Sequence, residues 1–292
     1  MGELLFAAKV SHVPSIYGGE PGVYAPIAGK HEEVREAHRK MAKRIRAEGA
    51  ETIVIVDTHW ICTVNFHINA AAHHEGLYTS EEQPHVIHDM AYSYPGDPEL
   101  ARAIAEAATA GGIITHAHDV KSLRFTYGAL VPLRYNNPEP KLRVVPIGAN
   151  VNASPQENMR FGQILGETIR KSKRRVAFIA SGSLSHKFWP NEQVMEHRWE
   201  VSSEFNRQVD LRALDLLKAG DHAALIDMIP IYREVCAGEC GMADTSILYG
   251  LLGGKAYKEA VVEYLPYYAA GCNGQVMLEF PIPGRVAARV SA

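Results

Sequence analysis

The stretch "ETIVIVDTHW", residues 51–60, decides the predicted fold. Five of its first six residues are β-branched, which is typical of a strand buried in the protein core. The stretch then turns polar at Asp57, Thr58 and His59. In open α/β sheets, ligands bind beyond the carboxyl ends of the strands. We therefore expect a functional site where this strand ends.

Strand and helix patterns alternate on both sides of this stretch. An apolar run at residues 4–10 precedes a helix pattern at 30–50, in which Val34, Ala37 and Met41 fall at helical spacing. The alternation of strand patterns and helix patterns continues toward the C-terminus. These later strand patterns lie at 64–70, 112–118, 142–151 and 174–183.

Capping signals mark the starts of two further helices. Asp97 followed by Pro98 combines an N-cap residue with a first-turn proline. The sequence "SPQE" at 154–157 is a capping box, and the helix that it opens runs to about Lys171. Further helix patterns lie at 192–219, at 221–235 and from near Asp244. A final pair of strand patterns, expected to be antiparallel, lies at 259–269 and 274–282.

This order of elements predicts an α/β fold with a central mixed, largely parallel sheet covered by helices on both faces. No segment resembles a linker, so we expect one domain over residues 1–283. The tail "GRVAARVSA", residues 284–292, has no evident partner and is predicted to be flexible.

Composition limits the classes of protein that the chain can represent. Its 292 residues are 47% hydrophobic, which is enough for a large core, and the formal net charge is -3. The basic run at 171–175 reads as a solvated turn, so we expect no nucleic-acid partner. Four cysteines are too few for a disulfide framework. Without a signal peptide or a run of roughly 20 apolar residues, we expect a cytoplasmic protein with no membrane partner.

Three predicted strands deliver a histidine to the same edge of the sheet. His12 follows the first strand, His59 ends the stretch quoted above, and His186 follows "SGSLS" after the strand at 174–183. One histidine at a strand end is usually a structural, hydrogen-bonded residue. Three of them at one edge favour a metal site or an acid–base site.

A metal would need a carboxylate beside the imidazoles. Two histidines and one carboxylate form the facial triad of non-haem Fe(II) oxygenases. Asp57 and Glu239 are both candidates, and Glu239 also fits a plain helix-start carboxylate. Cys236 and Cys240 bracket Glu239, but no second cysteine pair is present, so a cysteine zinc site is not favoured.

Several motifs together resemble a known family. They are "KVSHVPS", "VDTHW", "YGALVPLRY", "SGSLSHKF" and "AGECGMADTSILYGLLG". They look like the class III extradiol ring-cleaving dioxygenases, the protocatechuate 4,5-dioxygenase β-subunit superfamily, over residues 4–283. The segment at 73–101 is similar to the bacterial branch that cleaves 3,4-dihydroxyphenylacetate (homoprotocatechuate).

The resemblance implies roles for individual residues. The iron ligands fall on His12, His59 and Glu239, and the catalytic acid–base histidine falls on His186. Tyr127 stands where the protocatechuate enzymes have a second active-site histidine. The homoprotocatechuate and 2-aminophenol relatives share this departure, which argues against protocatechuate as the substrate.

The resemblance also implies a reaction, extradiol cleavage of a catechol by dioxygen at a non-haem Fe(II), with Mn(II) compatible with the same ligands. The expected substrate is 3,4-dihydroxyphenylacetate, which would give 5-carboxymethyl-2-hydroxymuconate semialdehyde in aromatic catabolism. His118, Lys121 and Arg124 are candidates to bind its carboxylate. The alternatives are another catechol, 2-aminophenol, or a metal-free binding protein on the same scaffold. We also expect a homo-oligomer.

Overall fold

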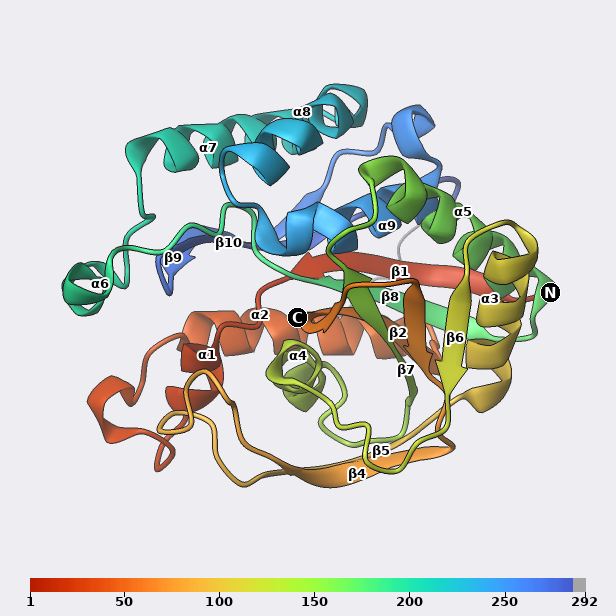
Figure 1. Cartoon of the computed structure of the whole chain (residues 1–292), viewed down its shortest axis with the longest axis horizontal. Helices are drawn as coiled ribbons and strands as arrows, with labels where there is room; N and C mark the ends of the chain where they lie inside the picture. Colours follow the sequence, from red (N-terminus) through yellow and green to blue (C-terminus); the bar gives the residue numbers. More distant parts are fainter. Residues whose placement is uncertain (286–292) are drawn as a thin grey trace.

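The computed structural model describes residues 1–285, and their main sheet has eight strands (Figure 1). The inner strands β7, β2, β8 and β1 are parallel to one another, and β3, β10 and β9 introduce antiparallel pairings. The sheet order is β6 (Thr115–His118), β3 (Phe66–Asn69), β7 (Arg143–Asn150), β2 (Thr52–Cys62), β8 (Arg175–Ser181), β1 (Glu3–Val10), β10 (Asn273–Glu279) and β9 (Val262–Ala270).

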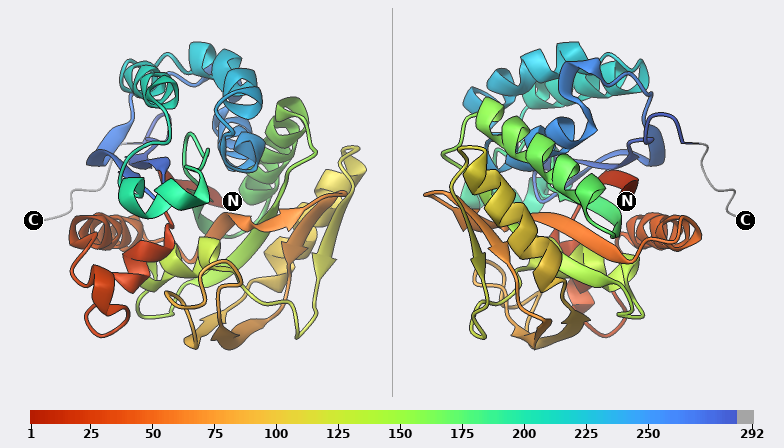
Figure 2. Two further views of the ribbon diagram at one scale, coloured as in Figure 1. Left: turned by 60° about the vertical axis from the view of Figure 1, so that its left-hand side comes forward. Right: turned by 90° about the vertical axis from the view of Figure 1, so that its right-hand side faces the viewer.

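Both faces of this sheet are covered, so the fold class predicted from the sequence is confirmed (Figure 2). One face packs against α3 (Pro98–Ala110), α5 (Pro155–Lys171), α7 (Glu204–Lys218), α8 (His222–Glu234) and α9 (Ala243–Leu252). The other face packs against α1 (Pro14–Gly18), α2 (Glu32–Ala47), α4 (Tyr127–Asn136) and the hairpin β4 (His73–Tyr78) and β5 (Met90–Pro95).

The β-branched run in β2 explains this two-sided core. Val54 and Val56 pack into one hydrophobic layer, whereas Ile53 and Ile55 pack into the other. Successive side chains of a strand point to opposite faces, so a strand covered on both sides must be apolar throughout. The capping box of α5 is also present as predicted, with Ser154 and Glu157 bonding each other's backbone N–H groups.

Three parts of the secondary structure differ from the sequence prediction. The helix pattern at 192–219 is two helices, α6 (Asn191–His197) and α7, because Ser203 caps α7 and α6 buries none of its residues. The region at 73–95 contains a two-stranded hairpin, β4–β5, for which no strand was predicted. No element was predicted for α4, which contains Pro132 and is buried on nearly all sides, so it lacks an amphipathic pattern.

The remaining expectations concern the termini, the cysteines and the membrane. Most of the tail expected at 284–292 lies outside the described residues, although Arg285 forms ion pairs with Glu3 and Glu48. All four cysteines are free thiols, as expected. Within residues 1–285, no helix combines the length and the apolar character that crossing a membrane requires.

Candidate active site

A bulge at the end of β2 positions the first polar residues. Asp57 is paired with Gly148 on β7 and Ile61 with the next residue, Ala149, so the three residues between them loop out of register. The Asp57 carboxylate accepts hydrogen bonds from the backbone N–H of His59 at 2.9 Å and from the Thr126 hydroxyl at 2.7 Å. Asp57 therefore shapes the bulge that presents His59.

A glycine makes this arrangement possible. A Cβ atom on Gly128 would lie 2.1 Å from Oδ1 of Asp57, so no larger residue fits at this position of α4. Asp57 is buried and is not one of the carboxylates that face the imidazoles. Of the two carboxylates that the sequence pattern left open, Glu239 is the one beside the histidines.

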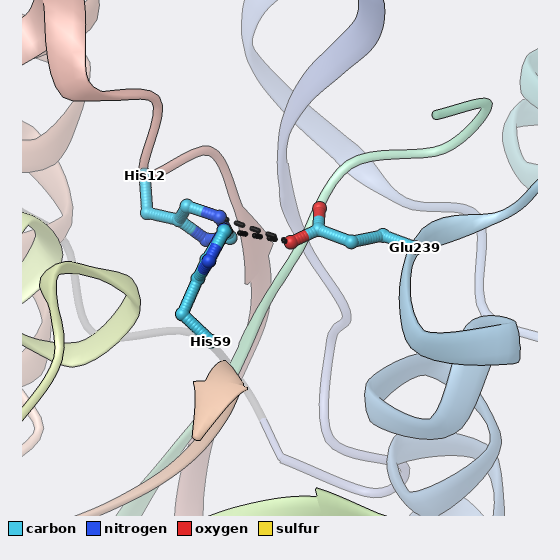
Figure 3. A group of neighbouring side chains, drawn as sticks. All are labelled: His12, His59 and Glu239. Carbon is cyan, nitrogen blue, oxygen red and sulfur yellow. Dashed lines mark ion pairs between the residues drawn. The ribbon is translucent and has the colours of Figure 1, made fainter. Parts of the chain in front are cut away.

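His12, His59 and Glu239 form a compact cluster at the carboxyl ends of the parallel strands (Figure 3). One potential ligand atom from each residue lies within 4.8 Å of the others. Nε2 of His12 is 3.1 Å from Oε1 of Glu239, and Nε2 of His59 is 3.4 Å from the same oxygen. Within residues 1–285, this is the group of three or more histidines, cysteines and acids whose potential ligand atoms already lie this close together.

The hydrogen bonds around His12 define which ring nitrogen carries the proton. Nδ1 of His12 lies 2.9 Å from the hydroxyl oxygen of Ser181. That hydroxyl donates its own proton to the carbonyl of Gly128, so it must accept from Nδ1–H. The lone pair of the neutral ring therefore lies on Nε2 and faces Glu239.

Glu82 orients the ring of His59 in the way that Ser181 orients the ring of His12. Its Oε1 accepts a hydrogen bond from Nδ1 of His59 at 3.0 Å, and its Oε2 accepts one from the Tyr127 hydroxyl at 2.8 Å. The Tyr127 ring lies against the His59 ring, with 3.9 Å between their centroids. Sequence reasoning missed Glu82, because it lies in a loop beside another acid, Glu81, and no spacing connects it to the site.

Three potential ligand groups thus converge on one point. Burial lowers the pKa of His59, but the hydrogen bond with Glu82 and the charge of Glu239 outweigh burial and raise it. For Glu239, burial raises the pKa, but the neighbouring imidazoles of His12 and His186 outweigh burial and hold the pKa of this carboxyl well below its usual range. The pocket favours positive charge, and two imidazoles with one carboxylate are suitable ligands for a divalent transition metal.

Glu239 is held by an unusual stretch of backbone. It begins η2 (Glu239–Met242), in which Cys240 and Met242 have positive φ angles of 45° and 60°. Such conformations are costly for residues with side chains and concentrate at functional sites. Both carboxylate oxygens also accept hydrogen bonds, from the Thr58 hydroxyl at 2.5 Å and from the backbone N–H of Ser183 at 2.6 Å.

His186 lies at the rim of this cluster. Its Nε2 is 3.9 Å from Oε2 of Glu239. The loop before it is fixed by Asp210 on α7, which accepts hydrogen bonds from both the backbone N–H and the hydroxyl of Ser185. Burial lowers the pKa of His186, so its ring is neutral near pH 7 and able to accept a proton.

The structure therefore brings together all five residues to which the resemblance assigned roles: His12, His59, Tyr127, His186 and Glu239. The candidates for binding a substrate carboxylate are more scattered. His118 lies on the edge strand β6, bonded to His67, and Lys121 and Arg124 are exposed. Cys236 and Cys240 are outside the group that could hold a metal.

Known proteins resemble this chain over almost its full length. Residues 6–277 match the family described as "Catalytic LigB subunit of aromatic ring-opening dioxygenase". A 3,4-dihydroxyphenylacetate 2,3-dioxygenase of Escherichia coli is 38% identical over 92% of this chain and 97% of its own. The 2-aminophenol 1,6-dioxygenase beta subunit of a Pseudomonas species is 25% identical, over 82% of each chain.

One solved structure shows the same fold. It is an uncharacterized protein of Escherichia coli K12, with a TM-score of 0.66, 14% identity, and coverage of 95% of this chain and 100% of its own. The fold, the clustered residues and the sequence matches define an enzyme, an aromatic ring-opening dioxygenase. More specifically, the chain belongs to the LigB family, which confirms the resemblance to extradiol dioxygenases inferred from its motifs.

Proposed function

We propose that this enzyme cleaves the ring of 3,4-dihydroxyphenylacetate beside its two hydroxyl groups, at an Fe(II) ion, to give 5-carboxymethyl-2-hydroxymuconate semialdehyde. The observation that supports this most strongly is the convergence of His12, His59 and Glu239 with His186 at its rim. The substrate is supported by the 38% identical relative, whose name specifies it. A second candidate is 2-aminophenol, which the name of the 25% identical relative specifies.

The ligands in this proposal are Nε2 of His12, Nε2 of His59 and the Glu239 carboxylate. Two neutral imidazoles and one carboxylate neutralise only half of the charge of a divalent ion and leave coordination positions open. When bound, Fe(II) would act as a Lewis acid toward the catechol oxygens and would activate dioxygen. Mn(II) accepts the same donors, so analysis of the metal in the active protein distinguishes the two ions.

In this proposal, His186 would transfer a proton and Tyr127 would donate a hydrogen bond. The neutral ring of His186 would accept a proton from a catechol hydroxyl and return it to an oxygen atom as the ring opens. Burial raises the pKa of the Tyr127 hydroxyl, so this group stays protonated and would serve as a hydrogen-bond donor to the substrate. That hydroxyl now donates to Glu82, an acceptor that the substrate oxygen would replace.

A panel of substrates tests the proposed specificity. Purified protein loaded with Fe(II) under anaerobic conditions should turn over 3,4-dihydroxyphenylacetate with the highest kcat/KM, and it should form a yellow product. Protocatechuate should be a poor substrate. The measurement is the absorbance of the ring-opened product for each compound after oxygen is admitted. A higher kcat/KM for 2-aminophenol or protocatechuate would overturn the assignment of the substrate.

Replacing Glu82 with glutamine tests its role behind His59. The neutral amide is a weaker acceptor for Nδ1–H of His59, so the imidazole becomes a poorer ligand. Loss of such a partner typically costs about 10–100-fold in metal affinity or activity. We expect a fall of this size in Fe(II) affinity, measured by competition with a chelator. The matched control is Glu81→Gln, which removes a carboxylate next to the Tyr78 hydroxyl and should leave iron affinity unchanged; equal losses in both variants would contradict the role of Glu82.

We further propose that residues 1–283 form the catalytic unit, and that the enzyme is a cytoplasmic homo-oligomer. The near-complete coverage of the Escherichia coli relative supports the extent of the unit. The Pseudomonas relative is named as a beta subunit, which supports assembly of such chains. Light scattering on the purified protein measures its assembly directly.

A further inference from the structure

A second cluster of histidines lies at the edge of the sheet, on β3 and β6. His67 on β3 is paired with His116 on β6, and His118 lies two residues beyond His116 on the same face of β6. The ring of His67 is 5.5 Å from that of His116 and 5.0 Å from that of His118. Two histidines separated by one residue on a strand, with a third opposite them, bring three imidazoles to one surface.

Hydrogen bonds orient the central ring of this cluster. Nε2 of His67 lies 2.8 Å from the carbonyl oxygen of Val64 and must donate its proton to it. The lone pair of the neutral ring is therefore on Nδ1, which is 2.8 Å from Nε2 of His118. A backbone carbonyl that fixes the outer N–H of a histidine is the usual support of a metal-binding imidazole.

The distance between these two nitrogens is close to that of two ligands on one ion. Nitrogens bound at about 2.0–2.1 Å to one tetrahedral zinc ion lie roughly 3.3 Å apart. If the proton of His118 moved from Nε2 to Nδ1, the lone pairs of Nδ1 of His67 and Nε2 of His118 would both be available to an ion. These two nitrogens would need to move apart by about half an ångström to admit it. Burial, and then the neighbouring His67 and His116, lower the pKa of His118, which keeps it neutral and available as a ligand.

His116 supplies the third nitrogen. Its side chain is exposed, and its Nε2 lies 3.2 Å from the amide nitrogen of Asn65. Because this ring is exposed, it can rotate so that a nitrogen faces the other two. The exposed pair of Arg102 and Asp119 lies beside β6, with 3.4 Å between the charged groups, so the immediate surroundings add little net charge.

We propose that His67, His116 and His118 form a second metal site, separate from the catalytic one, for a divalent ion that prefers nitrogen ligands, with Zn²⁺ as the probe. Three imidazoles without a carboxylate suit Zn²⁺, Ni²⁺ and Cu²⁺ better than Mg²⁺, Ca²⁺ or Mn²⁺. Fe²⁺ binds nitrogen sites more weakly than these three ions. Zn²⁺ can also occupy the catalytic triad when iron is absent, so the two sites have to be distinguished by substitution. The bound ion would tie the edge strand β6 to β3 and stabilise the fold.

Equilibrium dialysis against Zn²⁺ tests this site once the catalytic site has been disabled. The His12→Ala/Glu239→Ala variant should bind one Zn²⁺ per chain, and Zn²⁺ should raise its Tm. Adding His67→Ala and His118→Ala should abolish both the binding and the shift in Tm. Adding His88→Ala instead, which removes an exposed histidine outside the cluster, should change neither.

The same count in the chain with an intact catalytic site provides an independent check. His67→Ala/His118→Ala alone should lower the number of bound Zn²⁺ ions from two to one, even if the variant with four substitutions fails to fold. Equal binding with and without His67 and His118 would overturn the proposal. So would a folded His12→Ala/Glu239→Ala variant that binds no Zn²⁺.

Discussion

Replacing Glu239 with glutamine is expected to abolish both iron retention and ring cleavage. Oε1 of this residue is the atom that both imidazole nitrogens face, at 3.1 Å and 3.4 Å. The glutamine amide has no charge to hold a divalent ion. Its NH₂ group can also donate hydrogen bonds to Nε2 of His12 or His59, which would satisfy the lone pairs that a metal otherwise needs. These hydrogen bonds would take the place of the metal, and the site would stay without iron.

The loss should exceed the roughly 10–100-fold that removing a supporting residue costs, because a ligand itself is removed. Iron per chain after gel filtration and turnover of 3,4-dihydroxyphenylacetate measure the two effects. The matched control is Glu234→Gln, the same substitution at an exposed glutamate on α8, which should retain normal iron content and turnover. A Glu239→Gln protein with one iron per chain and normal turnover would remove this residue from the ligand set.

The second large effect is expected for His186→Phe, which should keep its iron but lose turnover. The phenyl ring fills a similar space, and the three ligands remain in place. It has no nitrogen to accept the catechol proton, and positioned acid–base groups are typically worth about 10²–10⁴-fold in rate. We expect kcat to fall by roughly this factor with an unchanged iron content.

Two further variants separate loss of the base from general damage. His186→Ala should be partly rescued by added imidazole, which a purely structural role would not allow. His197→Phe, a histidine on α6 whose ring lies 4.8 Å from that of Trp189, should turn over normally. If His186→Phe matched the wild-type rate, another group would have to move the proton.

Much of the fold could be predicted because local and global signals agree. The β-branched run of β2, the cap at Asp97 and the capping box at Ser154 each specify one element, and the structure contains all three. The false single helix at 192–219 arose because α6 and α7 both have helix-forming residues, and the break between them depends on the cap at Ser203. The strand β4 was missed because its sequence, HHEGLY, has few of the usual strand residues, although the alternating tyrosines of β5 were a usable strand signal.

The site was less predictable, because its geometry depends on contacts between distant residues. The sequence pattern placed His12, His59 and His186 at strand ends but left both Asp57 and Glu239 as candidates for the carboxylate. Their different positions follow from Thr126 and Gly128, which surround Asp57, and from Thr58, which bonds Glu239 across 181 positions of sequence. Glu82 had no local signal, because only folding brings its loop to His59 and Tyr127.

A crystal of the iron-loaded protein, measured by anomalous diffraction at the iron edge, tests the central claim most directly. The account predicts one iron peak about 2 Å from Nε2 of His12, Nε2 of His59 and a carboxylate oxygen of Glu239, distances typical of nitrogen and oxygen ligands. An iron peak at another place in a protein that is active in the same preparation would contradict it.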